Sequence, residues 1–169
     1  TASDQPHRSP KQPGCGRAPR IGCHAMAAAP EVDAAVAEFC PSGSPCRIEG
    51  AEFRGISLAQ LLALVGHLRR HCGDQGLLPG WTDAFSGAAV HLQAANLYHV
   101  NQRLILPSTS RYRCSFVELV ASCAEEQCPE YFVSHWWGEP VLHFVMCLQH
   151  FVATRQPSRA VFWVCAYAN

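Results

Sequence analysis

The sequence predicts an α/β fold that ends in a strand–helix–strand (βαβ) unit, preceded by a helical region and a disordered N-terminus. Two apolar runs of strand length, YFVSH (131–135) and AVFWVCAYA (160–168), predict the strands. Between them, apolar residues recur at helical spacing from Val141 to about Thr154. The chain has 169 residues, the length of one ordinary domain.

The first 50 residues carry most of the composition that is typical of disorder. They are rich in Pro, Gly and Ser, and the only weakly helical stretch is EVDAAVAEFC (31–40). We therefore expect residues 1–50 to be a disordered leader. Small residues follow Met26 as they do at a translation start. On that pattern, residues 1–25 are expected to be a leader or an untranslated segment.

Residues 51–125 read as a helix-rich region, because two capping boxes mark helix starts within it. Ser57-Leu-Ala-Gln60 precedes apolar residues at helical spacing, and Ser115-Phe-Val-Glu118 heads a short helix to about Cys123. Between these helices, GDQGLLPGWTDAFSG (73–87) has the Gly and Pro content of a loop. AANLYHVNQRLILP (94–107) is rich in strand formers and predicts a strand that ends at Pro107.

Residues 126–169 form the α/β part. Pro140 suits the first position of the helix, where its missing N–H costs nothing. Both strands are apolar on both faces, which is typical of the middle of a parallel sheet covered by helices. The crossover that joins them should be right-handed.

Composition excludes several classes of partner. Lys+Arg and Asp+Glu number 13 each, so no net charge attracts nucleic acid or an anionic membrane. No apolar run approaches the roughly 20 residues of a membrane-spanning helix. The ten cysteines follow no visible signal peptide, which favours reduced thiols in a cytoplasmic protein over a disulfide scaffold.

Metal binding is not expected. His67 and His71 are four residues apart on one helical face, a spacing that suits two ligands. However, the sequence contains neither a His-Glu-x-x-His motif nor a Cys-x-x-Cys motif. Exposed histidines at a helix end and small buried thiols are the simpler interpretation.

The corner between the first strand and the helix is the candidate site. In open α/β sheets, ligands collect beyond the carboxyl ends of parallel strands. The free N–H groups at the start of the helix suit phosphate or carboxylate, and an indole can stack on a base or a nicotinamide ring. The candidate ligand-binding residues are Ser134, His135, Trp136, Trp137, Gly138 and Glu139. In the alternative interpretation, the tryptophans are core residues and Glu139 caps the helix.

Catalysis by a Ser-His pair is not expected at this corner. Adjacent residues on a strand point to opposite faces, so Ser134 and His135 cannot readily bond to each other. The flanking sequence also lacks the Gly-x-Ser-x-Gly elbow. The catalytic residues, if the protein has any, stay unknown at this point.

The last 75 residues or so resemble a group of protist proteins that is abundant in dinoflagellate-type sequences. The shared segments are NLYHVN (96–101), CSFVELVA (114–121), FVSHWWGEPV (132–141) and FWVCAYAN (162–169). The corner also resembles the first box of Toll/interleukin-receptor (TIR) domains, in which a strand of Phe-Ile/Val-Ser character opens a flavodoxin-like parallel sheet.

This resemblance implies a TIR-like signalling or protein-interaction module, acting through a protein partner or self-association. The alternatives are an NAD+ glycohydrolase, with NAD as substrate and no bound cofactor, and a structural protein. In TIR enzymes the catalytic glutamate lies beyond the second strand, past Asn169, so it has no counterpart here and Glu139 does not replace it. The resemblance places Ser134 in the loop that lines the nucleotide pocket. It also implies that residues 126–169 are the N-terminal part of a truncated domain.

Overall fold

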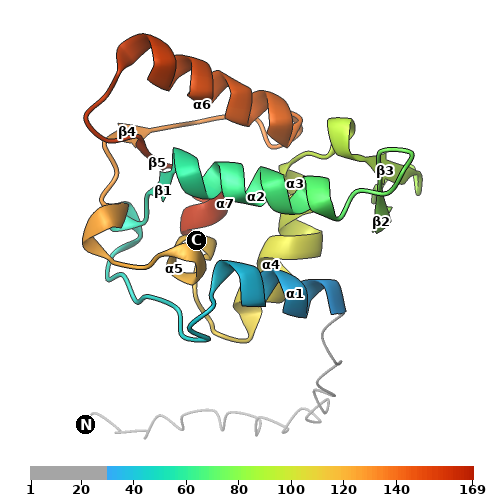
Figure 1. Cartoon of the computed structure of the whole chain (residues 1–169), viewed down its shortest axis with the longest axis horizontal. Coiled ribbons are helices and arrows are strands. Elements are labelled where there is room, and N and C mark those ends of the chain that lie inside the picture. Colours follow the sequence, from blue (N-terminus) through green and yellow to red (C-terminus); the bar gives the residue numbers. More distant parts are fainter. Residues whose placement is uncertain (1–29) are drawn as a thin grey trace, which may run out of the picture.

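The computed structural model describes residues 30–169, as a set of helices with two small sheets on opposite sides of it (Figure 1). The expectations for residues 1–25 lie outside this range. The helices are α1 Pro30–Phe39, α2 Leu58–Arg70, α3 Leu97–Val100, α4 Leu106–Ser110, α5 Phe116–Val120, α6 Val141–Arg155 and α7 Cys165–Ala168. The strands are β1 Ile56–Ser57, β2 Leu77–Thr82, β3 Ala89–His91, β4 Tyr131–Phe132 and β5 Val161–Trp163.

The βαβ unit is present as β4, α6 and β5. The two strands are parallel, with Tyr131 opposite Phe162 and Phe132 opposite Trp163. Helix α6 connects them and packs along α2 (Figure 1). It begins one residue after Pro140, which occupies the N-cap and not the first helical position.

The sheet that contains these two strands is mixed. The prediction that both strands lie in the middle of a parallel sheet is therefore wrong. Its strand order is β1-β5-β4, and β1 runs antiparallel to β5. Strand β4 therefore lies at an edge, where its Phe132 is 72% exposed and stacks on Trp163 at a centroid distance of 4.9 Å. The observed fold is α/β in the general sense of helices around a small mixed sheet.

The segment from residue 94 to 107 is helical, in contrast to the predicted strand. Asn96 caps α3, because its Oδ1 accepts from the His99 N–H at 3.2 Å and its own N–H donates to His99 Nδ1 at 3.2 Å. A π-helical segment, Asn101–Ile105, leads from α3 into α4. The buried residues Leu97, Val100 and Leu104 are spaced by three and four. This helical period outweighs the strand propensity of the individual residues.

The predicted loop at residues 73–87 contains most of a β-hairpin. Strands β2 and β3 pair antiparallel, with Leu77 opposite His91 and Thr82 opposite Ala89. The Asp83 carboxylate closes the turn by accepting from the Ser86 N–H at 2.8 Å and the Ser86 hydroxyl at 2.8 Å. The Gly and Pro residues therefore sit within a strand and its turn as well as in loops.

The second predicted strand is shorter than its apolar run. β5 covers only Val161–Trp163, and Cys165–Ala168 turns into α7. Tyr167 of α7 is fully buried, with its ring 5.9 Å from that of Phe116. A continuous apolar run is compatible with either a buried strand or a buried helix, because neither leaves a polar face.

A single core joins all parts of the described chain. Residues 30–50, whose composition is typical of disorder, contribute α1 and Ile48 to this core. The Phe39 ring of α1 meets that of Phe116 edge-on at 5.5 Å. The core therefore extends from α1 to α7 without a division near residue 125.

Glu118 ties the segment after α1 to α5. Its buried carboxylate accepts from the Ile48 N–H at 3.1 Å and from the Ser115 N–H at 2.8 Å and hydroxyl at 3.1 Å. The Arg54 guanidinium lies 3.6 Å away. Burial would raise the pKa of Glu118, but the bonds from Ser115 and Ile48 and the charge of Arg54 outweigh it and lower the pKa.

Two general expectations concern cysteines and membranes. The eight cysteines within residues 30–169 are all free thiols. None of the helices in this range combines the length and the apolar character needed to cross a bilayer.

Candidate functional site

The corner loop, residues 133–139, connects β4 to α6 at the carboxyl end of β4, as expected. Backbone bonds hold both ends of the loop. The Val133 N–H donates to the Trp163 carbonyl at 2.9 Å, and the Trp137 carbonyl accepts from the Leu97 N–H at 3.0 Å. Within the loop, the Glu139 N–H donates to the Trp136 carbonyl at 3.0 Å. The loop is thus fixed to β5 and to α3.

The two tryptophans have different environments. Trp137 is half-buried, its ring lies 5.5 Å from that of Tyr98, and its Nε1–H donates to Cys165 Sγ at 3.5 Å. Trp136 is 73% exposed. Gly138 lies against Trp136, and a Cβ at this glycine would overlap the indole ring. The core interpretation therefore describes Trp137, whereas Trp136 presents its ring to the outside.

Ser134 and His135 do not form a dyad. Ser134 is exposed, whereas the His135 ring stacks on Phe144 at a centroid distance of 4.2 Å. Both His135 ring nitrogens are buried without a hydrogen-bond partner among the described residues. Burial lowers the pKa of His135, so the ring is held neutral. Glu139 is half-buried, and no side-chain bond caps α6.

A hollow of about 220 Å³ opens beside the corner loop, and only two of its nine lining residues, Trp136 and Gly138, were predicted as site residues. Trp136 and Gly138 line one side, and Phe85, Tyr98, Asp83 and His99 line the other. We call it the corner hollow. The Asn96-x-x-His99 capping pattern is the sequence signal that identifies the helix carrying Tyr98 and His99.

Asp83, which is half-buried, and His99 form an ion-pair-like contact in the corner hollow. His99 Nε2 lies 3.1 Å from Asp83 Oδ2. Because His99 Nδ1 accepts the Asn96 N–H, the ring proton resides on Nε2 and is donated to Asp83. The bonds from Ser86, followed by that from His99, lower the pKa of Asp83. Both imidazole nitrogens are thus engaged, so this pair positions the hairpin against α3 and offers no free base.

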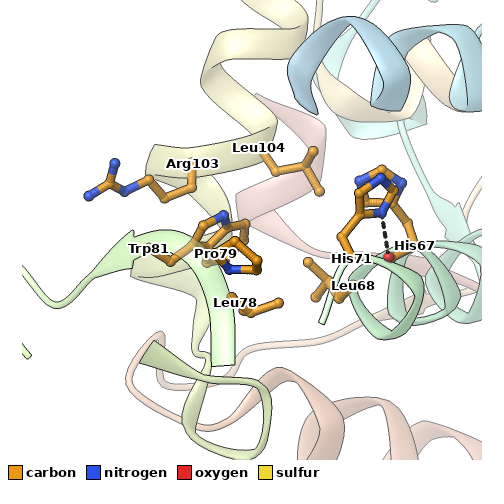
Figure 2. Close-up of a pocket in the computed structure, with 8 residues that line it drawn as sticks. All are labelled: His67, Leu68, His71, Leu78, Pro79, Trp81, Arg103 and Leu104. Carbon is orange, nitrogen blue, oxygen red and sulfur yellow. Dashed lines mark hydrogen bonds between the residues drawn. The ribbon is translucent and has the colours of Figure 1, made fainter. Parts of the chain in front are cut away.

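A second cavity, of about 190 Å³, lies between α2, β2 and the π-helical segment (Figure 2). We call it the Trp81 cavity. Its lining residues are His67, Leu68, His71, Leu78, Pro79, Trp81, Arg103 and Leu104.

The two histidines of the Trp81 cavity are in contact, with ring centroids 4.1 Å apart and ring planes tilted by 31°. His67 Nδ1 lies 2.9 Å from a Glu38 carboxylate oxygen, and His71 Nδ1 donates to the His67 carbonyl at 2.9 Å. Burial lowers the pKa of His67. Between residues 30 and 169, no group of three His, Cys, Asp or Glu side chains is arranged to hold a metal ion.

Comparison with known proteins found no matching family model, no matching curated protein and no matching solved structure.

Proposed function

We propose that this chain is a protein-interaction module that binds a second copy of itself through the corner hollow. One observation carries the proposal: three aromatic rings border the same hollow and are mostly in contact with solvent. Phe85 is 97% exposed, Trp136 73% and Tyr98 54%. Aromatic residues are enriched at protein interfaces, where they supply much of the binding energy.

The geometry of the hollow favours a homotypic contact. Phe85 projects from the turn between β2 and β3, beside a hollow of about 220 Å³. In a two-fold symmetric dimer, each copy can insert Phe85 next to the Trp136 ring of the other, since such an interface uses the same patch twice. The resemblance to TIR domains, which assemble homotypically in signalling, supports the same role.

Contacts between its walls hold the backbone around the hollow in place. The Asp83–His99 contact anchors the hairpin to α3, and the Trp137 carbonyl anchors the corner loop to the same helix. The backbone segments that carry the aromatic residues are therefore positioned before a partner arrives, which lowers the entropic cost of association.

Sedimentation of the full chain over a range of concentrations tests the proposal. We expect a concentration-dependent dimer that Trp136→Ser weakens by about 30-fold, as for an interface residue worth about 2 kcal/mol. The matched control is Met146→Ser, which removes a side chain that is 62% exposed on α6 and does not line the hollow. A chain that stays monomeric, or a dimer equally sensitive to both substitutions, contradicts the proposal.

Cleavage of NAD+ is the second candidate function, and the exposed Trp136 ring favours it. An indole beside the corner hollow is suited to stack on a nicotinamide ring. Incubation with NAD+ and measurement of free nicotinamide tests this function. Release of nicotinamide, and a lower rate of release by Trp136→Ser, would support this function. The absence of NAD+ turnover would remove it.

A further inference from the structure

Strand β4 turns its two side chains to opposite faces of the sheet, as successive residues of a strand do. Tyr131 faces α6, where its ring meets that of Phe151 edge-on at 5.1 Å (Figure 1). Phe132 points to the other face and lies against Trp163, its neighbour across the ladder. Because Phe132 is 72% exposed, the sheet is open on this second face at β4.

A hollow of about 410 Å³ lies on this open face, and we call it the sheet hollow. The rings of Phe132 and Trp163 stack there at a centroid distance of 4.9 Å, with their planes 14° apart. The indole is held in place, because Trp163 Nε1–H donates to the Ala51 carbonyl at 2.8 Å. No residue of the sheet hollow lines the corner hollow or the Trp81 cavity. The lining residues are Glu52, Pro129, Glu130, Tyr131, Phe132 and Trp163.

The charged groups of the sheet hollow are two carboxylates. Glu52 and Glu130 are both exposed, and the lining residues include no Lys, Arg or His. Neither glutamate forms an ion pair within residues 30–169, and Glu130 accepts one hydrogen bond, from the Ser158 hydroxyl at 3.3 Å. The faces of aromatic rings also carry partial negative charge and attract cations. The carboxylates and the rings therefore both favour a positively charged ligand.

The outer edge of β4 is available to a further strand. In a parallel ladder, alternate residues bond to the neighbouring strand, and here the Val133 N–H donates to the Trp163 carbonyl at 2.9 Å. The backbone N–H and C=O of Phe132 therefore point away from β5, off the edge of the sheet. An extended peptide can bond to such an edge. A side chain that this peptide places beside Phe132 on the same face would lie over the sheet hollow.

We propose that the sheet hollow and the edge of β4 bind an extended segment of a partner protein through one arginine side chain. The guanidinium is planar, so it can stack on the exposed Phe132 ring, and its forked N–H groups can donate to the carboxylates of Glu52 and Glu130. Lysine fits this site less well, because its ammonium is a compact charge without a planar face. Since the sheet hollow shares no residue with the corner hollow, this binding does not depend on self-association.

A labelled peptide of sequence TVRVT tests the chemistry, with fluorescence anisotropy as the readout and the full chain as the receptor. It is expected to bind about 10-fold more tightly than the same peptide with citrulline, which keeps the planar shape without the charge. The peptide with lysine should bind with intermediate affinity. Added salt should weaken the arginine peptide and leave the citrulline peptide unchanged. Equal binding of the arginine and citrulline peptides, or no binding of the arginine peptide, overturns the proposal.

A free guanidinium distinguishes a peptide partner from a small cation. Agmatine has the guanidinium but no peptide backbone to pair with β4, so we expect it to bind about 10-fold or more weakly than the arginine peptide. Agmatine that binds as tightly as the peptide overturns the assignment to an extended segment.

Substitutions then locate the site. Phe132→Ser is expected to weaken the arginine peptide about 10-fold and Glu130→Gln about 3-fold. The matched controls are Phe85→Ser, in the corner hollow, and Glu126→Gln, since both side chains are exposed and neither lines the sheet hollow. Both controls should bind the peptide as the parent chain does. Arginine-peptide binding that survives Phe132→Ser and Glu130→Gln in protein shown to be folded by circular dichroism, or that falls equally in the controls, overturns the assignment.

Discussion

Replacing Glu118 by Gln tests whether its carboxylate fastens Ile48 to α5. The carboxylate accepts three hydrogen bonds, from the Ile48 N–H and from the N–H and hydroxyl of Ser115. A glutamine keeps only one acceptor oxygen and turns an NH2 group toward the other donors. At least one backbone N–H, of Ile48 or of Ser115, then loses its acceptor inside the core.

The magnitude follows from these bonds. A hydrogen bond to a charged group contributes about 1.5–3 kcal/mol, and a buried unpaired donor adds a penalty of similar size. Glutamine recovers part of this loss, because no charge has to be buried. We expect Glu118→Gln to lower the free energy of unfolding by about 2 kcal/mol.

Urea unfolding at neutral pH measures this loss, with Glu126→Gln as the isosteric control. Glu126 is exposed, so its substitution should change stability by less than about 0.5 kcal/mol. The pKa of Glu118 lies below its ordinary value of 4.5, so the unfolded chain takes up a proton first as the pH falls. The stability from Glu118 is therefore present above pH 4.5 and lost in acid, and the variant should lack this part of the acid dependence. Equal stability of the two variants would refute the reasoning.

Three further predictions concern close packing, helix propensity and pH. Gly55→Ala should destabilise the fold by about 3 kcal/mol in the same urea assay, because the new Cβ would lie 2.6 Å from the Gln127 carbonyl oxygen. Gly66→Ala, inside α2, should stabilise it by about 0.5–1 kcal/mol; a loss at Gly66 would contradict this. Burial lowers the pKa of His67 and His135 from 6.5, so the unfolded chain binds their protons first and stability should fall as the pH drops below 6.5. His135→Phe should reduce the dependence of stability on pH in this range. An unchanged dependence would show that His135 is not held neutral.

Local signals in the sequence predicted local structure correctly. The capping boxes at Ser57 and Ser115 are present with both of their reciprocal hydrogen bonds. Both residues of each box lie within four positions, so no distant contact is needed to define them. The βαβ unit was predictable for the same reason, since the strands are adjacent in sequence through α6.

The elements that the sequence did not predict depend on contacts between residues far apart in the chain. β1 has two residues and becomes a strand only because Ile56 pairs with Phe162. The corner loop was found, but the opposite wall of its hollow, with Phe85 and Tyr98, comes from a hairpin and a helix that were assigned as a loop and a strand. The wall of the Trp81 cavity at Arg103 was missed because a π-helical turn has no simple sequence pattern.

The strand order β1-β5-β4 also has a consequence for the time at which the protein can fold. The central strand, β5, follows both of its neighbours in the chain, so β1 and β4 cannot join a sheet until residues 161–163 have been synthesised. Loop closure between residues 56 and 162 then precedes any gain from that pairing. The sheet should therefore form only after residues 161–163 are available, whereas α2 and the hairpin can form earlier on the ribosome.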